Sequence, residues 1–200
     1  MQICAVIKNR TIKEVEAMLT KNPEIRDLAE NRWPDLENNF RHFPNYRRHF
    51  IGPLQTNKIK KILPFIEVIQ SIDREKLLPL LEAAALKPLE FCFQINISRE
   101  HKKHGFLPEQ LPQAIENYLA ANYKNLKLIG LMTIVERTEP QKRLEDFRAM
   151  RELFDEINAK YFHDAPLPTL SMGMSEDKEQ AKQAGATMLR LGTALFYPLK

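Results

Sequence analysis

The sequence predicts an α/β fold, a single-domain (β/α)8 barrel spanning residues 1–200. Short apolar runs alternate along the chain with longer amphipathic segments, as in repeated βαβ units with a parallel sheet. Eight such runs with seven intervening segments match the eight-unit barrel, although 200 residues is short for that fold. The alternative, a doubly wound open sheet, needs fewer strands and often carries an early glycine-rich phosphate loop, which this sequence does not contain.

Each predicted strand is a short, mostly apolar run bounded by polar or turn-forming residues. These runs are 3–7, 26–30, 49–51, 67–72, 89–97, 127–134, 169–174 and 186–191. The run over 89–97 is nearly continuous, as expected for a strand buried on both faces, whereas the run over 26–30 is the weakest.

Each predicted helix is an amphipathic segment with apolar residues on one face. These helices are 11–21, 34–43, 57–65, 73–84, 108–121, 141–160 and 176–183. Thr11 and Glu14 form a capping box at the start of the first helix, and Asp73 is expected to cap the fourth. Gly185 ends the last one.

Composition and charge limit the classes of function. Lys and Arg number 30 and Asp and Glu 26, a net charge of +4 that suits an anionic small ligand as well as nucleic acid. No apolar run is long enough to span a membrane, and the N-terminus lacks the pattern of a signal peptide. Cys4 and Cys92 form no CxxC motif and are expected to be buried thiols, so we predict a cytoplasmic protein.

A barrel carries its chemistry at the C-terminal ends of its strands, and Lys8 follows the first of them. Cys4, Val6 and Lys8 alternate at period two, so they share one strand face. If that face points inward, desolvation lowers the pKa of the amine, which can then attack an aldehyde to form a Schiff base. The alternative is a lysine that extends into solvent at the end of a strand.

Arg190 is expected to point into the barrel, because Leu189 and Leu191 suit the helix-facing side of the same strand. A buried guanidinium is costly without a partner. A bound anion or a ring nitrogen would supply one, and an internal salt bridge is the alternative.

Small hydroxyl residues and glycines follow the last two strands, where barrels often bind phosphate. Ser171 and Ser175 flank the seventh strand end, and Gly192 and Thr193 follow the eighth. The helix expected near Glu176 would add the positive end of its dipole. Together these features predict a phosphate site.

Two other polar clusters are assigned to solvent rather than to ligands. His101 and His104 could touch a metal ion, but the lysines between them would repel it, so no metal site is predicted. The basic pair Arg47-Arg48 and the run 58–61 lack interleaved aromatic residues, so they are read as solvated faces and nucleic acid is not a predicted partner.

The sequence also resembles a known family in eight segments that occur in the same order. The segments are Ala5-Val6-Ile7-Lys8, Glu30-Asn31, His49-Phe50-Ile51-Gly52-Pro53-Leu54-Gln55-Thr56-Asn57-Lys58, Gln94-Ile95-Asn96-Ile97-Ser98, Lys103-His104-Gly105-Phe106, Gly130-Leu131-Met132-Thr133-Ile134, Ser171-Met172-Gly173-Met174-Ser175 and Arg190-Leu191-Gly192-Thr193-Ala194. On these segments the chain is identified as similar to the YggS/PROSC family of pyridoxal 5′-phosphate (PLP) homeostasis proteins, whose barrel resembles the N-terminal domain of alanine racemase.

The resemblance implies a PLP site. It implies that Lys8 carries PLP as a Schiff base, that Arg190 faces the pyridine nitrogen, and that Ser171 or Ser175 holds the phosphate. Gly192 and Thr193 would complete the phosphate site. The remaining residues implied to line the pocket are Asn31, His49, Asn96 and Met172.

The sequence departs from the family pattern in four places. The family begins with a helix before the first strand, whereas here Met1 adjoins that strand. Ile7 replaces the usual serine, and Ala29-Glu30-Asn31-Arg32 replaces Gly-Glu-Asn-Tyr. The chain stops at Lys200, so the usual helix after the last strand is expected to be missing.

The function that the resemblance implies is a PLP carrier or buffer in vitamin B6 and amino-acid homeostasis, not an enzyme. An arginine at the ring nitrogen cannot readily donate a proton, which weakens PLP as an electron sink. The alternatives are a PLP-dependent amino-acid racemase or decarboxylase, and an apo scaffold that binds a macromolecule. The expected partners are PLP and PLP-dependent apoenzymes, and the expected state is a monomer, with a dimer as the alternative.

Overall fold

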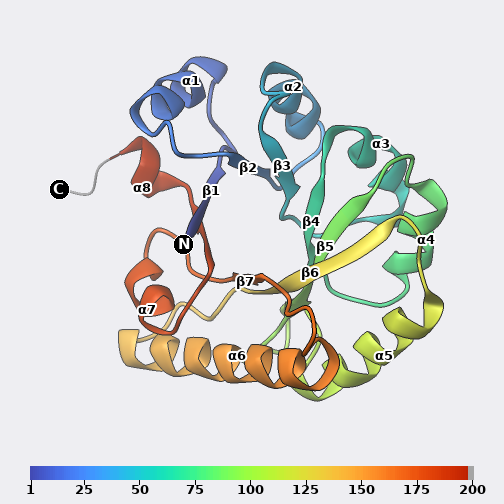
Figure 1. Ribbon diagram of the computed structural model, residues 1–200. Coiled ribbons are helices and arrows are strands. Elements are labelled where there is room, and N and C mark those ends of the chain that lie inside the picture. The colour runs from blue at the N-terminus through green and yellow to red at the C-terminus, as the bar shows by residue number, and fades with distance from the viewer. Residues whose placement is uncertain (198–200) are drawn as a thin grey trace.

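The computed structural model describes residues 1–197, in which eight parallel strands form a closed barrel in the order β1 to β8 (Figure 1). The strands are β1 (Gln2–Val6), β2 (Asp27–Glu30), β3 (Arg47–Phe50), β4 (Val68–Ile72), β5 (Leu89–Ile95), β6 (Leu126–Thr133), β7 (Thr169–Ser171) and β8 (Met188–Leu191). The barrel closes where β8 pairs with β1, Arg190 opposite Cys4. The predicted barrel is confirmed and the open sheet is excluded.

Helices follow the strands around the outside of the barrel, and α6 is the longest (Figure 1). The α-helices are α1 (Ile12–Lys21), α2 (Asp35–His42), α3 (Ile59–Ile62), α4 (Leu77–Ala84), α5 (Leu111–Ala121), α6 (Pro140–Tyr161), α7 (Lys178–Gln183) and α8 (Thr193–Phe196). Three 3₁₀ turns, η1 (Thr56–Lys58), η2 (Leu63–Phe65) and η3 (Pro108–Gln110), flank α3 and precede α5. The predicted helix over 57–65 is therefore three short pieces, the last of which contains Pro64.

Two helix-start predictions have different outcomes. The capping box at α1 is confirmed, because the Thr11 amide donates to Glu14 Oε2 at 2.8 Å and the Glu14 amide donates to Thr11 Oγ1 at 3.3 Å. The cap predicted at Asp73 is wrong, since α4 starts at Leu77 without a side-chain cap. The Asp73 carboxylate instead pairs with His104 Nδ1 at 2.8 Å.

One turn of helix, α8, follows β8, at the place where the sequence predicted that the family's usual helix would be missing. Helix α8 lies beside α1 (Figure 1), and Arg10, just before α1, contacts this turn. Its guanidinium donates to Tyr197 Oη at 2.8 Å and lies 4.7 Å from the centres of the Phe196 and Tyr197 rings.

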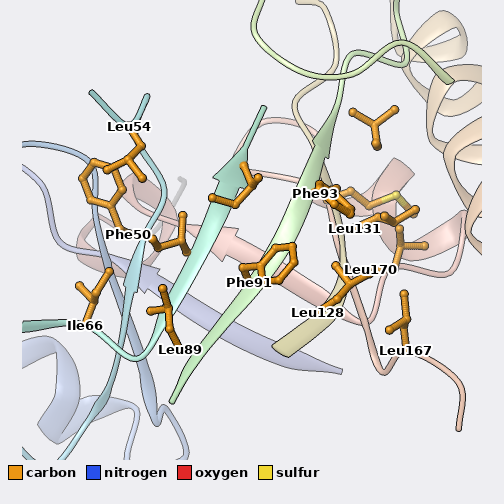
Figure 2. Packing of buried hydrophobic residues seen from close by; sticks show 14 of the residues in the cluster. Phe50, Leu54, Ile66, Leu89, Phe91, Phe93, Leu128, Leu131, Leu167 and Leu170 are labelled. Carbon is orange, nitrogen blue, oxygen red and sulfur yellow. The ribbon is translucent and has the colours of Figure 1, made fainter. Parts of the chain in front are cut away.

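The strand period of two separates an outer core from the barrel interior. Phe91 and Phe93 pack edge to face, 5.3 Å apart, in the large cluster between strands and helices (Figure 2). Cys92, which lies between them on β5, belongs to a small cluster inside the barrel. The same alternation turns Gln70 and Arg190 into the interior, where both are buried.

The basic pair Arg47-Arg48 starts β3 and does not form the solvated face that was predicted. Arg47 pairs with Glu90 and lies 3.6 Å from Asp27 Oδ1, while Arg48 Nε donates to Glu67 Oε2 at 3.0 Å. Strand β3 thus begins two residues earlier than predicted, because neighbouring carboxylates pair with its charges. In the part of the chain that the structure describes, no helix is both long and apolar enough to cross a membrane.

Candidate functional site

A pocket of about 220 Å³ lies at the C-terminal mouth of the barrel, where the sequence places the chemistry. It brings together six of the ten predicted site residues, although they are separated by up to 185 positions along the chain. These six are Lys8, Asn31, Ser175, Arg190, Gly192 and Thr193. The pocket therefore joins the predicted amine, guanidinium and phosphate-binding groups.

Lys8 lies two residues beyond the end of β1, on the pocket wall that Val6 also forms. Its side chain is exposed, so the desolvation expected from the sequence is not observed. The nearby carboxyl of Glu30 is buried at the end of β2 and accepts a hydrogen bond from Asn39 Nδ2 at 2.8 Å. Burial raises the pKa of Glu30, and the hydrogen bonds from Asn39 and the Asn31 amide, with a smaller effect of the Lys8 charge, counteract only part of that rise.

Arg190 points into the barrel as predicted, and its side chain is only 2% exposed. Nη1 donates to Ser171 Oγ at 2.7 Å, and Nη2 donates to the Thr133 carbonyl at 2.7 Å. Among residues 1–197 no carboxylate pairs with it, so the salt-bridge alternative is not what the structure contains. Burial lowers the pKa of Arg190 to about 10, which leaves the guanidinium charged at neutral pH.

The predicted phosphate end of the pocket is formed by Ser175 and the first turn of α8. Ser175 Oγ accepts a hydrogen bond from the Ala194 amide at 3.2 Å, and Gly192 and Thr193 line the pocket beside it. The helix expected near Glu176 starts later, at Lys178. Asp177 precedes it, and its carboxylate accepts a hydrogen bond from the Met174 amide at 2.5 Å, so that amide is already paired.

Asn31 closes the opposite wall of the pocket. A Cβ at Gly52 would lie 2.2 Å from the Asn31 carbonyl oxygen, so only glycine allows the two loops to approach this closely. The side-chain oxygen Oδ1 of Asn31 is buried, and no partner for it occurs among residues 1–197. It is an acceptor available to a donor in the pocket.

Four predicted site residues do not line this pocket. Ser171 and His49 are buried within the barrel, where Ser171 binds Arg190 and His49 binds Asp27. Asn96 holds the following turn, since its Nδ2 donates to the Glu100 carbonyl at 2.9 Å. Met172 is fully buried in the outer core. Met172 follows the inward-facing Ser171 and points outward, whereas Gly173, with a φ of +91°, breaks the strand period and Met174 lines the pocket instead.

Six further residues line the pocket that the sequence did not single out as site residues: Val6, Ile51, Ile134, Arg137, Met174 and Glu176. Arg137 and Glu176 form an ion pair at 3.4 Å between the loops that follow β6 and β7. Neither loop position carries a periodic signal, because only the closed barrel brings them together.

A larger pocket, of about 550 Å³, lies at the other end of the strands, between the turn before β4 and the turn before β5. Leu63, Pro64 and Leu86 line it, and its charged residues are lysines only. It therefore lacks the mixture of amine, guanidinium and hydroxyl groups that the smaller pocket brings together.

The buried His49 predicts a pH-dependent stability. Burial lowers the pKa of His49, and the hydrogen bond with Asp27 opposes that effect only in part. The unfolded chain binds this proton below its ordinary pKa of 6.5, whereas the folded chain resists it. The contribution of neutral His49 to the free energy of unfolding is complete above pH 6.5. It is lost as the pH falls from there, by up to ~1.4 kcal/mol per pH unit.

Urea unfolding at several pH values checks this expectation. His49→Asn should lack this part of the slope, whereas His101→Asn, which changes an exposed histidine, should keep it. The raised pKa of Glu30 gives an opposite trend above its ordinary value of 4.5, so the difference between variants is the quantity to compare. Equal slopes in the wild type and His49→Asn would contradict the prediction.

Comparison with known proteins places this chain in a family. The family model described as alanine racemase, N-terminal domain, matches residues 1–199. The pyridoxal phosphate homeostasis protein of Pseudomonas aeruginosa is 43% identical over 152 residues, which cover 74% of this chain and 63% of that protein. The protein of the same name from Vibrio cholerae is 36% identical and covers 98% of this chain and 84% of its own length.

A solved structure shares the fold. PipY of Synechococcus elongatus, described with PLP bound, superposes with a TM-score of 0.83 at 26% identity and covers 98% of this chain and 92% of its own. The matched segment spans just under two thirds of the Pseudomonas relative. The chain belongs to the pyridoxal phosphate homeostasis protein family, and its barrel is an alanine racemase N-terminal domain.

Proposed function

We propose that this protein binds PLP at the mouth of its barrel and carries or buffers it through a Schiff base on Lys8. The observation that supports this most directly is the convergence of Lys8, Arg190 and Ser175 on one pocket of about 220 Å³. The formation of the Schiff base joins the Lys8 nitrogen to the aldehyde carbon and releases one water molecule. PLP when bound supplies an electron sink, and the protein supplies orientation and electrostatics.

The residues present fit such a cofactor at both ends. Ser175 Oγ and the backbone amides of Gly192 and Thr193 can donate to phosphate oxygens, and we propose Ser175 rather than Ser171 because Ser171 is already bound to Arg190. Arg190 can donate to the ring nitrogen. The unpaired Asn31 Oδ1 can accept a hydrogen bond from a ligand hydroxyl.

The same residues favour a carrier without turnover. The Arg190 guanidinium, with a pKa of about 10, donates a hydrogen bond but does not readily transfer its proton, so it does not protonate the ring nitrogen. Among residues 1–197 the one carboxylate that lines the pocket is that of Glu176, which is paired with Arg137. The relatives carry homeostasis names rather than enzyme names, in agreement with this proposal.

We also propose that residues 1–200 act as one PLP-binding domain that passes PLP to apoenzymes. The free and buried thiols Cys4 and Cys92 suit a reducing compartment such as the cytoplasm. We propose a monomer, with a dimer as the alternative.

Covalent trapping tests the proposal. PLP is added to the purified protein, the near-ultraviolet and visible absorption is recorded, and borohydride reduction then fixes the adduct for peptide mapping. We expect one adduct, on the peptide that contains Lys8, and no turnover when amino acids are added. Reduction that labels several exposed lysines equally, or none, would overturn the Schiff-base proposal.

A further inference from the structure

A continuous line of hydrogen bonds crosses the barrel interior below the pocket. Arg190 Nη1 lies 2.7 Å from Ser171 Oγ, and Ser171 Oγ lies 2.7 Å from Gln70 Oε1. Gln70 Nε2 lies 2.9 Å from His49 Nδ1, and His49 Nε2 lies 2.7 Å from Asp27 Oδ1. All five side chains are buried, and they come from strands β8, β7, β4, β3 and β2.

The ends of this line allow only one direction for its protons. Arg190 can only donate, so the hydroxyl hydrogen of Ser171 must go to its other neighbour, Gln70 Oε1. The ionised Asp27 can only accept, so His49 must carry its hydrogen on Nε2. His49 Nδ1 is then an acceptor, and Gln70 Nε2 donates to it. The two ends independently require the same orientation of the Gln70 amide.

The second hydrogen on Gln70 Nε2 supports this orientation. The Met188 sulfur Sδ lies 3.3 Å from Gln70 Nε2. A thioether sulfur is a weak acceptor, so it suits an amide N–H and not an amide oxygen at this position. If His49 were protonated on both nitrogens, Gln70 would have to turn over. The Ser171 hydroxyl would then have two donors facing it and no acceptor for its own hydrogen. The neutral state of His49 is therefore part of the line.

The charges around His49 come from every side of the barrel. Asp27 on β2 and Glu67 before β4 favour its protonation, whereas Arg47 on β3 opposes it. Burial outweighs the acidic groups, so the pKa of His49 lies below its ordinary value. The other ionisable side chains of the interior are Cys4, Cys92 and Arg190.

We propose that Gln70 and His49 are positioning residues that act through Ser171 on Arg190. Neither lines the pocket, yet they fix which Arg190 hydrogens are used inside the barrel and which remain for a ring nitrogen in the pocket. This inference rests on the proposed PLP site. Loss of the Gln70 amide leaves the Ser171 hydroxyl free to rotate, so Arg190 keeps only the Thr133 carbonyl as a directed partner.

The first experiment needs no PLP. Long-range ¹⁵N–¹H NMR of the wild-type protein reports the protonation of each of the five histidines, and the resonance missing from His49→Asn identifies His49. We expect His49 to be neutral at pH 7 with its hydrogen on Nε2. A hydrogen on Nδ1, or on both nitrogens, would overturn the direction of the line whatever the outcome with PLP.

The second experiment uses PLP labelled with ¹⁵N in the ring. Gln70→Met replaces the amide by an apolar side chain of similar length, and Cys92→Ala is the matched control because Cys92 is equally buried in the barrel interior. We expect the ring-nitrogen resonance to move in Gln70→Met, with a Kd for PLP about tenfold higher, the equivalent of one hydrogen bond of about 1.4 kcal/mol. Cys92→Ala should leave the resonance unchanged.

These outcomes separate the two proposals. If Gln70→Met folds and binds PLP with the wild-type ring resonance, positioning by Gln70 is excluded while the PLP site stands. If the wild type forms no adduct at Lys8, the proposed function fails, and the histidine spectrum still tests the hydrogen-bond line. If Gln70→Met does not fold, the histidine NMR spectrum of the wild type decides whether the hydrogen-bond line runs as proposed.

Discussion

Lys8→Ala is expected to abolish covalent PLP binding and the associated visible absorption band. The Schiff base needs a primary amine, and Lys8 is the only lysine that lines the pocket in the described part of the chain. Ser175, Gly192 and Thr193 stay in place in this variant, because Lys8 is exposed and forms none of the core contacts. We therefore expect weak, non-covalent binding of PLP to remain, which equilibrium dialysis would measure.

Two further variants sharpen this test. Lys8→Arg keeps the positive charge but cannot form a Schiff base, so it should also lose the band. Lys13→Ala removes an exposed lysine on α1, outside the pocket, and should keep the wild-type spectrum. A band of wild-type strength in Lys8→Ala would show that another amine carries PLP. Loss of the band in Lys13→Ala would show that the effect is not specific to Lys8.

The barrel could be predicted from the sequence because its signal is local. Apolar runs such as 89–97 and amphipathic runs such as 141–160 alternate regularly along the chain. A strand that is apolar on both faces must be buried on both faces, as in a parallel sheet covered by helices. Lys8 and Arg190 could be placed for the same reason, since the period of two along one strand decides which face a residue takes. These predictions needed no knowledge of how distant strands pair.

The remaining features depend on contacts between strands, which the sequence does not show. Ser171 was a candidate phosphate ligand, but the barrel places its hydroxyl between Arg190 and Gln70. His49 was expected in the pocket, but the register of β2 against β3 pairs it with Ala29 and brings its ring to Asp27. Gln70 carried no signal at all, because a lone glutamine in an apolar run gains its meaning only from partners on other strands.

Asp27→Ala is expected to give the largest loss of stability among substitutions in the barrel interior. Asp27 is buried, and its carboxylate accepts hydrogen bonds from His49 Nε2 at 2.7 Å and from Gln2 Nε2 at 2.5 Å. Alanine leaves the His49 donor without an acceptor in the interior, which costs about 1–3 kcal/mol, and removes a charge 3.6 Å from Arg47. Urea unfolding at pH 7 would measure the loss.

Asp27→Asn separates the charge from the hydrogen bond, because its amide oxygen can still accept from His49. We expect it to lose less stability than Asp27→Ala. Burial alone would raise the pKa of Asp27, but the hydrogen bonds from His49 and Gln2 and the charge of Arg47 lower it. The advantage of the wild type over Asp27→Asn should be full above the ordinary pKa of 3.8 and decrease as the pH falls below it.

The two variants together decide whether Asp27 fixes the proton on His49. In Asp27→Ala the hydrogen on Nε2 loses its acceptor and only the Gln70 amide still favours that tautomer, so the NMR signature of His49 should change along with the stability. In Asp27→Asn the same tautomer should persist, since an acceptor oxygen still faces Nε2. If the free energy of unfolding of Asp27→Ala lies within about 0.5 kcal/mol of the wild-type value and His49 keeps its tautomer, then Arg190 alone sets the direction of the hydrogen-bond line.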